Sequence, residues 1–402
     1  MTLQSITANQ IHTMTNVDGG QGTTGLIERK YINIENDKIL SVSSKPQFDD
    51  IIDFQNQYDI LPGMINAHAH LELSQLESPL ELENIYKSQN PSTNNFSIQK
   101  IITNNYSHNF DQWINQLMRF RRSSVYDSTL AISAAKQYFA ENNETAAVVD
   151  IIPFDFNPNQ IDIGKNIEWI RHLELIAWDS ITVTKKIKTI CNLPKNSYSG
   201  LSPHAPHTVS ADLIEFAVNF GVPISMHLAE SPDEIRLLKS YDGKLFEMMR
   251  KIDENYEPSK ILAGNRAMDY LQILSRAKLS LVIHCNYLDD SEIQFLAKNR
   301  ETMAVVYTPR SHDYFGFGDF PLQKMLDNGV CVLLGTDSKA STPDLSLSNE
   351  IKRAVFMNPI IPLETFFQMT TIHAAKFLGL IENYGTIESG KKAVFTLFRN
   401  IC

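Results

Sequence analysis

The sequence predicts an α/β protein built on a (β/α)8 TIM-type barrel, with a small β domain formed by both chain ends. Three observations lead to this fold. Eight short apolar runs alternate with longer segments of helical pattern, the two ends of the chain read as short strands with turns, and His, Glu or Asp residues follow several of the apolar runs. Alternation of buried strands with helices is typical of a parallel sheet, and eight such units close a barrel.

The two chain ends predict the small β domain. Residues 1–57 contain short apolar stretches separated by turn residues, with a glycine-rich break at 19–22. Near the other end, a turn containing glycine and lysine leads into the apolar run 394–398. Short strands bounded by turn residues are typical of β structure. We therefore expect residues 1–57 and 378–402 to form one domain beside a barrel of residues 58–377.

The barrel strands are predicted from eight apolar runs. In chain order they cover residues 60–65, 146–152, 174–177, 198–202, 223–227, 279–284, 303–307 and 331–335. A doubly wound open sheet is the alternative fold, but it binds ligands at one switch point, whereas polar residues here follow many strands. Residues 84–109, rich in Asn, Ser and Gln, are expected to form a long loop over the first strand, either a lid or a surface insertion.

The composition excludes several classes of protein. The chain has 402 residues and a formal net charge of -10, so it has no electrostatic footprint for nucleic acid or an anionic membrane surface. The N-terminus lacks the features of a secretory signal, and no apolar run approaches the length of a membrane span. Four cysteines without CxxC spacing argue against a disulfide framework or a structural zinc site. We expect a reducing, cytoplasmic setting.

A metal site is predicted from residues that follow the apolar runs. His68 and His70 follow the first run and stand two positions apart, so they point to the same side of a strand end. His227 closes the fifth run and Asp337 follows the eighth. Each could instead be structural, as a buried hydrogen-bonded histidine or a helix cap. Four such residues at strand ends favour one divalent metal per chain, Zn2+ or Fe2+, with a position open for water.

Two further residues are candidates for acid–base chemistry. Glu230 follows His227 by three positions and could carry a proton between water and substrate, although it could also be an acidic charge at a helix start. His284, at the end of the sixth run, could orient the attacking water, stabilise a tetrahedral intermediate, or bind a second metal. A two-metal site of this type needs a bridging lysine or acid near the fourth strand. No lysine stands there, so we favour a single metal.

Five short motifs carry a resemblance to a known family. They are Leu-Pro-Gly-Met-Ile-Asn-Ala-His-Ala-His at 61–70, Ser-Pro-His-Ala-Pro at 202–206, His-Leu-Ala-Glu at 227–230, Gly-Thr-Asp-Ser at 335–338 and the glycine-containing tail at 385–393. Together they resemble the amidohydrolase superfamily, in the branch of the adenosine- and cytosine-type deaminases and the triazine chlorohydrolases. Residues 72–74 and 308–316 resemble the aminodeoxyfutalosine deaminases of menaquinone synthesis.

The resemblance implies a role for each candidate residue. The implied metal ligands are His68, His70, His227 and Asp337. Glu230 would be the proton shuttle, and His284 and Asp337 would hold the nucleophilic water. His204, at the end of the fourth strand, resembles the histidine that contacts a ribosyl or ring group in nucleoside-type members.

Two more substrate contacts are suggested by position. Glu72 lies two residues beyond His70 and could project into the pocket. Arg310, after the seventh run, could pair with a substrate carboxylate through both of its guanidinium nitrogens. A purely structural ion pair is an equally good reading of Arg310.

These residues lead us to expect a hydrolase acting on carbon–nitrogen bonds other than peptide bonds. It would deaminate an amino-substituted N-heterocycle, an aminopurine nucleoside derivative such as aminodeoxyfutalosine. A chlorohydrolase or cyclic-amide hydrolase on the same scaffold is the alternative, since fold and metal do not fix the leaving group. A non-catalytic binding protein is a remote alternative, because all the expected metal ligands and the proton shuttle Glu230 are present. The partner expected is a small-molecule substrate, with no nucleic acid and no membrane; a homodimer stays open.

Overall fold

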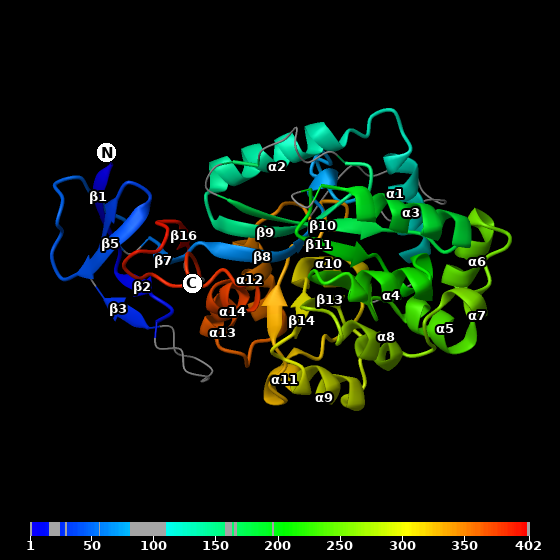
Figure 1. Cartoon of the computed structure of the whole chain (residues 1–402). Helices are drawn as coiled ribbons and strands as arrows, with labels where there is room; N and C mark the ends of the chain where they lie inside the picture. Colours follow the sequence, from blue (N-terminus) through cyan, green and yellow to red (C-terminus); the bar gives the residue numbers. More distant parts are fainter. Residues whose placement is uncertain are drawn as a thin grey trace, which may run out of the picture.

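The computed structural model describes residues 2–15, 25–28, 30–55, 57–80, 110–156, 163–164, 167–194 and 197–399. The larger part of the molecule is a barrel wrapped by helices, and a smaller β part that contains the N-terminus lies at one end of it (Figure 1). The predicted loop at 84–109 lies outside the described residues. No helix in the described ranges is long and apolar enough to cross a membrane.

Eight parallel strands form the barrel, which confirms the predicted fold. In chain order they are β8 (Met64–Ala69), β9 (Thr145–Ile152), β10 (Glu168–Leu175), β11 (Gly200–Pro203), β12 (Ile224–Leu228), β13 (Ser280–His284), β14 (Met303–Tyr307) and β15 (Val332–Leu334). Each strand pairs with the next one in the chain. The last and first strands meet through a parallel bridge between Ala69 and Asp337, where the backbone N–H groups of Thr336 and Asp337 donate to the His68 carbonyl at 3.0 and 3.1 Å.

The strands form because their residues are apolar and covered on both faces. Every residue of β9 is buried, as expected of a strand packed between the barrel interior and the helices. In β10 the prediction was wrong at one end: the strand begins at Glu168, six residues before the predicted start. Its first half carries Glu168 and Arg171 and is only partly buried, so it lacks the apolar run by which the other strands are recognised.

Helices cover the outside of the barrel (Figure 1). They are α1 (Phe110–Arg121), α2 (Ser128–Asn142), α3 (Ser180–Asn192), α4 (Ala211–Asn219), α5 (Pro232–Ser240), α6 (Lys244–Ile252), α7 (Pro258–Ile261), α8 (Ala267–Leu274), α9 (Asp290–Lys298), α10 (Pro309–Phe315), α11 (Leu322–Asp327), α12 (Leu347–Met357), α13 (Leu363–Thr370) and α14 (Ile372–Phe377). Several begin at a side-chain cap. Asp179 caps α3, Ser210 caps α4 and Ser346 caps α12, each accepting a backbone N–H of the first turn.

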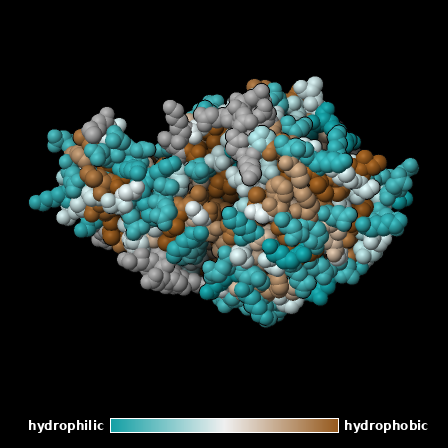
Figure 2. Space-filling view, viewed as in Figure 1, coloured by the Kyte–Doolittle hydropathy of each residue, from teal (hydrophilic) through white to brown (hydrophobic). Residues whose placement is uncertain are grey.

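The two chain ends contribute two small sheets, as predicted. One sheet orders β5 (Lys38–Ser43), β4 (Tyr31–Glu35), β1 (Leu3–Thr7) and β6 (Ile51–Asp53); the other orders β16 (Phe395–Phe398), β7 (Asp59–Pro62), β2 (Gln10–His12) and β3 (Leu26–Glu28). Buried Ile6, Ile11, Ile32, Ile39 and Ile60 pack together between the sheets. Figure 2 shows that most of the visible surface of the molecule is hydrophilic, with apolar residues scattered over it.

The first predicted strand is in fact two strands. The run 60–65 is divided at Gly63: β7 pairs with β16 in the small sheet, and β8 begins the barrel. A Cβ on Gly63 would lie 2.7 Å from Cγ1 of Val394 and 2.8 Å from Cβ of Ala146, so only glycine fits at this crossing. An apolar run gives no sign of such a division, because both strands are buried.

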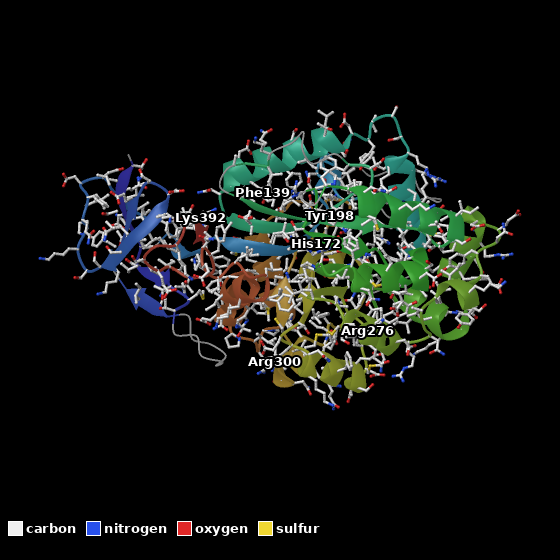
Figure 3. All side chains as sticks on the ribbon, viewed as in Figure 1. Phe139, His172, Tyr198, Arg276, Arg300 and Lys392 are labelled. Atoms are coloured by element: carbon white, nitrogen blue, oxygen red, sulfur yellow. The ribbon has the colours of Figure 1, made fainter. Side chains whose placement is uncertain are left out.

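A buried polar pair lies inside the barrel. His172 of β10 is buried among the strands (Figure 3). Its Nδ1 lies 2.7 Å from Oγ of Ser225 on β12. Burial lowers the pKa of His172 to about 3, so the ring is neutral.

Candidate metal centre and active site

Three histidines converge at the carboxyl end of the barrel. His68 and His70 stand at the end of β8, two positions apart and therefore on the same side, and His227 comes from β12. One ring nitrogen of each lies within 4.8 Å of the others, and all three side chains are buried. Nε2 of His70 is 3.4 Å from Nε2 of His227. These strands lie well apart in the barrel, so only its closed shape brings the three rings together.

The nitrogens of this cluster have the state that a metal requires. Both ring nitrogens of His68 and Nδ1 of His70 are buried without a hydrogen-bond partner in the described part of the chain. Burial and the His68 imidazole lower the pKa of His70 well below its ordinary value and that of His227 to about 3, so both rings are neutral. Buried nitrogens normally find partners, so a set left unpaired indicates a missing ligand. Neutral imidazoles suit a divalent transition metal.

His227 is held in one tautomer. Its Nδ1 lies 2.8 Å from the backbone carbonyl of His204, which can only accept, so Nδ1 carries the hydrogen. Nε2 is then the lone-pair nitrogen, and it is the one that faces His70. Such a backbone partner on the far nitrogen is the usual support of a metal-binding histidine.

Asp337 completes the cluster from the loop after β15. Its Oδ1 lies 3.6 Å from Nε2 of His68 and 3.8 Å from Nε2 of His70. Oδ2 faces away and accepts hydrogen bonds from Ser311 at 2.7 Å and Ser341 at 3.2 Å. Burial alone would raise the pKa of Asp337, but the close approach of His68 and the neighbouring His284 and His70 outweighs burial and holds that pKa below its ordinary value.

The two serines were not identified from the sequence. Ser311 lies within the motif at 308–316, which was noted only for its resemblance, and Ser341 follows Asp337 by four residues. Their role depends on a contact between the ends of β14 and β15, which no local pattern reveals. The helical spacing of Asp337 and Ser341 is the one signal that could have suggested the second of them.

Glu230 and His284 face each other beside the cluster. Oε1 of Glu230 lies 3.4 Å from Nε2 of His284, and both side chains are buried. Burial, with Asp337 and Glu234 nearby, raises the pKa of Glu230 well above its ordinary value. Burial lowers the pKa of His284, so its ring is neutral. A carboxyl group that binds a proton readily thus stands next to a neutral hydrogen-bonding ring, which is the arrangement needed for proton transfer.

Backbone strain marks the same strand ends. Ala229, His284, Cys285 and Asp337 have φ between 53° and 70°, the left-handed region that residues with a Cβ rarely adopt. Each lies at or next to the carboxyl end of its strand. Strain of this kind persists only where the surrounding structure holds it, and it is common at functional sites.

A cavity of about 280 Å³ leads from the surface to this cluster. Its inner end is lined by His70, His204, His227, Glu230, His284 and Asp337. Its outer wall is mostly apolar and comes mainly from α1 and α6, with Trp113, Leu117, Met118, Met248 and Ile252; Arg121 and Arg122 at the end of α1 are the charged part of this wall. Trp113 anchors α1 over the barrel mouth because its Nε1 donates to the carbonyl of Ala340 at 3.0 Å.

The three predicted substrate contacts differ in where they lie. His204 lines the cavity, and its Nδ1 is 2.8 Å from Oγ1 of Thr208. Glu72 is not among the lining residues: its carboxylate pairs with Arg121 and accepts the Tyr126 hydroxyl at 2.6 Å. Arg121 itself does line the cavity, so Glu72 supports the wall from behind. The sequence did not indicate Arg121, because its partner lies 49 residues away.

Arg310 also lies away from the cavity lining. Its guanidinium pairs with Glu350 at 2.6 Å and with Asp344 at 2.7 Å, and Glu350 is fully buried. These contacts match the structural ion pair that was the alternative reading of this residue. They join α10 to the start of α12 and leave no nitrogen directed at the candidate site among the contacts described.

The chain is similar to known proteins along nearly its whole length. The amidohydrolase family model matches residues 60–400. A 5-methylthioadenosine/S-adenosylhomocysteine deaminase of Bacillus cereus is 25% identical over 398 residues, covering 92% of this chain and 80% of the relative. A 5'-deoxyadenosine deaminase of Methanococcus maripaludis is 31% identical over 229 residues, covering 54% of this chain and 49% of the relative.

Solved structures share the fold. The aminofutalosine deaminase of Helicobacter pylori, in complex with methylthio-coformycin, has a TM-score of 0.76 at 18% identity, covering 99% of this chain and 93% of that one. An adenosine deaminase of Xanthomonas campestris with bound zinc has a TM-score of 0.64 at 18% identity, covering 97% and 83%. The match of residues 60–400, more than four-fifths of the sequence, establishes the family. The chain belongs to the amidohydrolase family and is a hydrolase of carbon–nitrogen bonds.

Proposed function

We propose that this protein is a metal-dependent aminohydrolase that releases ammonia from an aminopurine nucleoside derivative. The observation that carries the proposal is the position of a proton-binding carboxyl group, Glu230, beside a cluster of buried histidines that have unpartnered ring nitrogens and line one cavity. Its relatives support the choice of leaving group, since the curated ones named above are deaminases of adenosine-type nucleosides.

Four residues would hold one divalent cation, Zn2+ or Fe2+: His68, His70, His227 and Asp337. When bound, such a cation lowers the pKa of water and makes a nucleophile available at neutral pH. A structural neighbour that contains zinc supports Zn2+ as the first choice. Ser311 and Ser341 fix the orientation of Asp337, so that one carboxylate oxygen is directed at the histidines.

Glu230 carries the protons in this proposal. Its raised pKa allows it to accept a proton from the attacking water and then to donate it to the ring nitrogen next to the carbon that bears the amino group. His284, neutral and 3.4 Å away, donates or accepts a hydrogen bond at the oxygen that adds to that carbon. The remaining hydroxyl proton of the adduct then passes, again through Glu230, to the amino nitrogen. The bond from carbon to that nitrogen breaks, and ammonia leaves as a carbonyl forms on the ring.

The shape of the cavity suggests how a nucleoside would lie. The base belongs at the polar inner end, beside His204 and Glu230, where the proton transfers take place. The sugar and its 5' substituent would then extend along the apolar wall of α1 and α6. An apolar wall favours a substituent that gains from leaving water over a free 5' hydroxyl. We propose aminodeoxyfutalosine as the substrate, with 5'-methylthioadenosine and 5'-deoxyadenosine as the nearest competitors.

A dechlorinating hydrolase is the second candidate. Triazine hydrolase from Arthrobacter aurescens shares the fold, with a TM-score of 0.67 at 16% identity. The leaving group does not follow from the fold, so both products must be measured.

The test compares Glu230→Gln with Asp233→Asn. Glutamine keeps the size and hydrogen bonding of Glu230 but cannot carry the proton, so ammonia release should fall by about 10²–10⁴-fold at unchanged metal content. Asp233 is an acid in the first turn of α5, so its amide variant removes a helix-start charge and should keep full activity. Substrates would be aminodeoxyfutalosine, adenosine, its 5'-deoxy and 5'-methylthio derivatives, S-adenosylhomocysteine and a chlorotriazine.

Two results would contradict this proposal. If Glu230→Gln turns over as fast as the wild type, Glu230 does not carry the proton. If the wild type releases chloride from the chlorotriazine but no ammonia from any nucleoside, the protein is a chlorohydrolase.

A further inference from the structure

The start of α5 departs from the pattern that its sequence predicts. Ser231 caps the helix, and Glu234 stands three residues later, the arrangement of a capping box. In a closed box the glutamate would turn back to the N–H of the serine. Here Ser231 accepts the N–H of Glu234 at 3.1 Å, but the Glu234 carboxylate reaches further back. It accepts the backbone N–H of Ala229 at 2.7 Å and that of Glu230 at 3.4 Å.

Helix α9 shows the same pattern in its ordinary form. Asp289 caps α9, and Glu292 stands three residues later, in the same helical position as Glu234. The Glu292 carboxylate accepts the N–H of Asp289 at 2.8 Å and closes the box. Both glutamates are buried, at 1% and 4% exposure, so burial does not explain the difference between them. What differs is the neighbour: α5 begins directly after the candidate catalytic residue.

The turn that receives the Glu234 carboxylate is strained. Ala229 has a φ of 53°, a conformation that costs free energy for a residue with a Cβ. Asn286 holds the carbonyl groups of the same turn. Its backbone N–H donates to the Ala229 carbonyl at 3.0 Å, and its Nδ2 donates to the Glu230 carbonyl at 2.8 Å. Both N–H groups and both carbonyls of this dipeptide are therefore fixed, by Glu234 on one side and Asn286 on the other.

We propose that Glu234 is a positioning residue for catalysis: it holds the strained Ala229–Glu230 turn and thereby aims the Glu230 carboxyl group at His284. This inference rests on the proposed function of Glu230. His227 and Glu230 are three residues apart, and both must face one cavity although β12 ends between them. The left-handed turn allows this. A carboxylate that binds two successive N–H groups stabilises such a turn, as backbone nests bind anions elsewhere.

The experiment measures kcat, KM and metal content of the metal-loaded enzyme for Glu234→Gln. The amide keeps one acceptor but presents an N–H to the second N–H group, so the turn loses half of its support. Misplacing a reacting group by about 1 Å costs about 10²-fold, so we expect kcat to fall by about 10- to 100-fold. KM and metal content should stay near those of the wild type, because neither depends on the direction of Glu230.

Glu292→Gln is the matched control. It alters a buried glutamate at the same helical position and should lower thermal stability without changing kcat. If Glu234→Gln changes stability alone, as Glu292→Gln is expected to do, Glu234 is only a helix cap and the inference is wrong. Should Glu234→Gln fail to fold, Asn286→Ala replaces it: this variant removes one hydrogen bond to the same turn and should lower kcat at unchanged KM. An unchanged kcat for it would equally overturn the inference.

The inference can fail separately from the proposed function. If the wild type releases no ammonia from any nucleoside, the proposed function is wrong, and amide hydrogen exchange then decides about the turn. Faster exchange confined to residues 229–230 in Glu234→Gln supports the positioning role, since those two N–H groups have lost their acceptor. Exchange equal to that of the wild type at 229–230 overturns it.

Discussion

A substitution at Gly335 tests whether the candidate metal site depends on the close approach of the last barrel strand, β15, to the first, β8. This residue follows β15, and a Cβ placed on it would lie 2.9 Å from each of three His68 atoms: Cβ, the backbone nitrogen and the backbone oxygen. Two of these atoms belong to the backbone and cannot rotate away. Gly335→Ala must therefore push the end of β8 outward, and His68 with it.

The size of the effect follows from these contacts. Forcing an extra methyl group into a packed site costs about 1–3 kcal/mol. Unfolding entropy of about 2.1 cal/mol/K per residue converts that to a lowering of Tm by about 1–4 °C for a chain of 402 residues. Displacing a support of a metal ligand typically weakens metal binding by about 10–100-fold, which is the change expected for Gly335→Ala.

Gly63→Ala is the control, because it crowds the opposite end of the same strand. The added Cβ would meet Val394 and Ala146 at 2.7 and 2.8 Å, far from the histidine cluster along β8. We expect a similar fall in Tm and unchanged metal affinity, measured by competition with a chelator of known strength. If both variants lose metal equally, general destabilisation is the cause. If Gly335→Ala binds metal like the wild type, the close approach does not position His68.

Three other outcomes are expected. His227→Ala should lose most of its bound metal, measured by elemental analysis, while circular dichroism stays that of a folded barrel; full retention of metal would exclude His227 as a ligand. Arg310→Ala should lower stability by about 3–5 kcal/mol in denaturant unfolding, because it removes the cationic partner of the buried Glu350, while KM stays unchanged; a large rise in KM would restore the substrate role of Arg310. Burial lowers the pKa of His373 to about 4, so the folded state binds fewer protons than the unfolded state between about pH 4 and 6.5. The free energy of unfolding should fall as the pH falls through that window, and it should fall less steeply in His373→Gln. If wild type and variant show the same dependence on pH, the pKa of His373 is not lowered.

The parts of the fold that depend on local pattern could be predicted from the sequence. A strand buried on both faces must be apolar over its length, and β9, β13 and β14 satisfy this condition, so each was found. Strand β10 does not satisfy this condition, since Glu168 and Arg171 occupy its partly exposed half. The division at Gly63 could not be predicted, because it depends on Val394, more than 300 residues away.

In the candidate site, too, features that follow from local sequence could be predicted and features that depend on distant contacts could not. Residues at strand ends, such as His68 and His227, can be recognised because parallel strands bring their carboxyl ends to one face. Glu72 and Arg310 also follow strands, yet their charges are satisfied by Arg121 and Glu350, which lie 49 and 40 residues further along the chain. Whether a charge meets substrate or another side chain depends on such distant partners, and no spacing rule supplies them.

The pairing of β16 with β7 determines when this sheet can form during synthesis of the chain. Strand β16 is synthesised after all eight barrel strands, yet Thr396 accepts the backbone N–H of Met64, the first residue of the barrel. During translation β7 therefore lacks one of its two neighbouring strands, and Met64 lacks this hydrogen bond, until Thr396 has left the ribosome. A contact of such long range is slow to form and leaves apolar strand edges exposed meanwhile. The nascent chain should consequently depend on chaperones far more than the full-length chain refolding from denaturant.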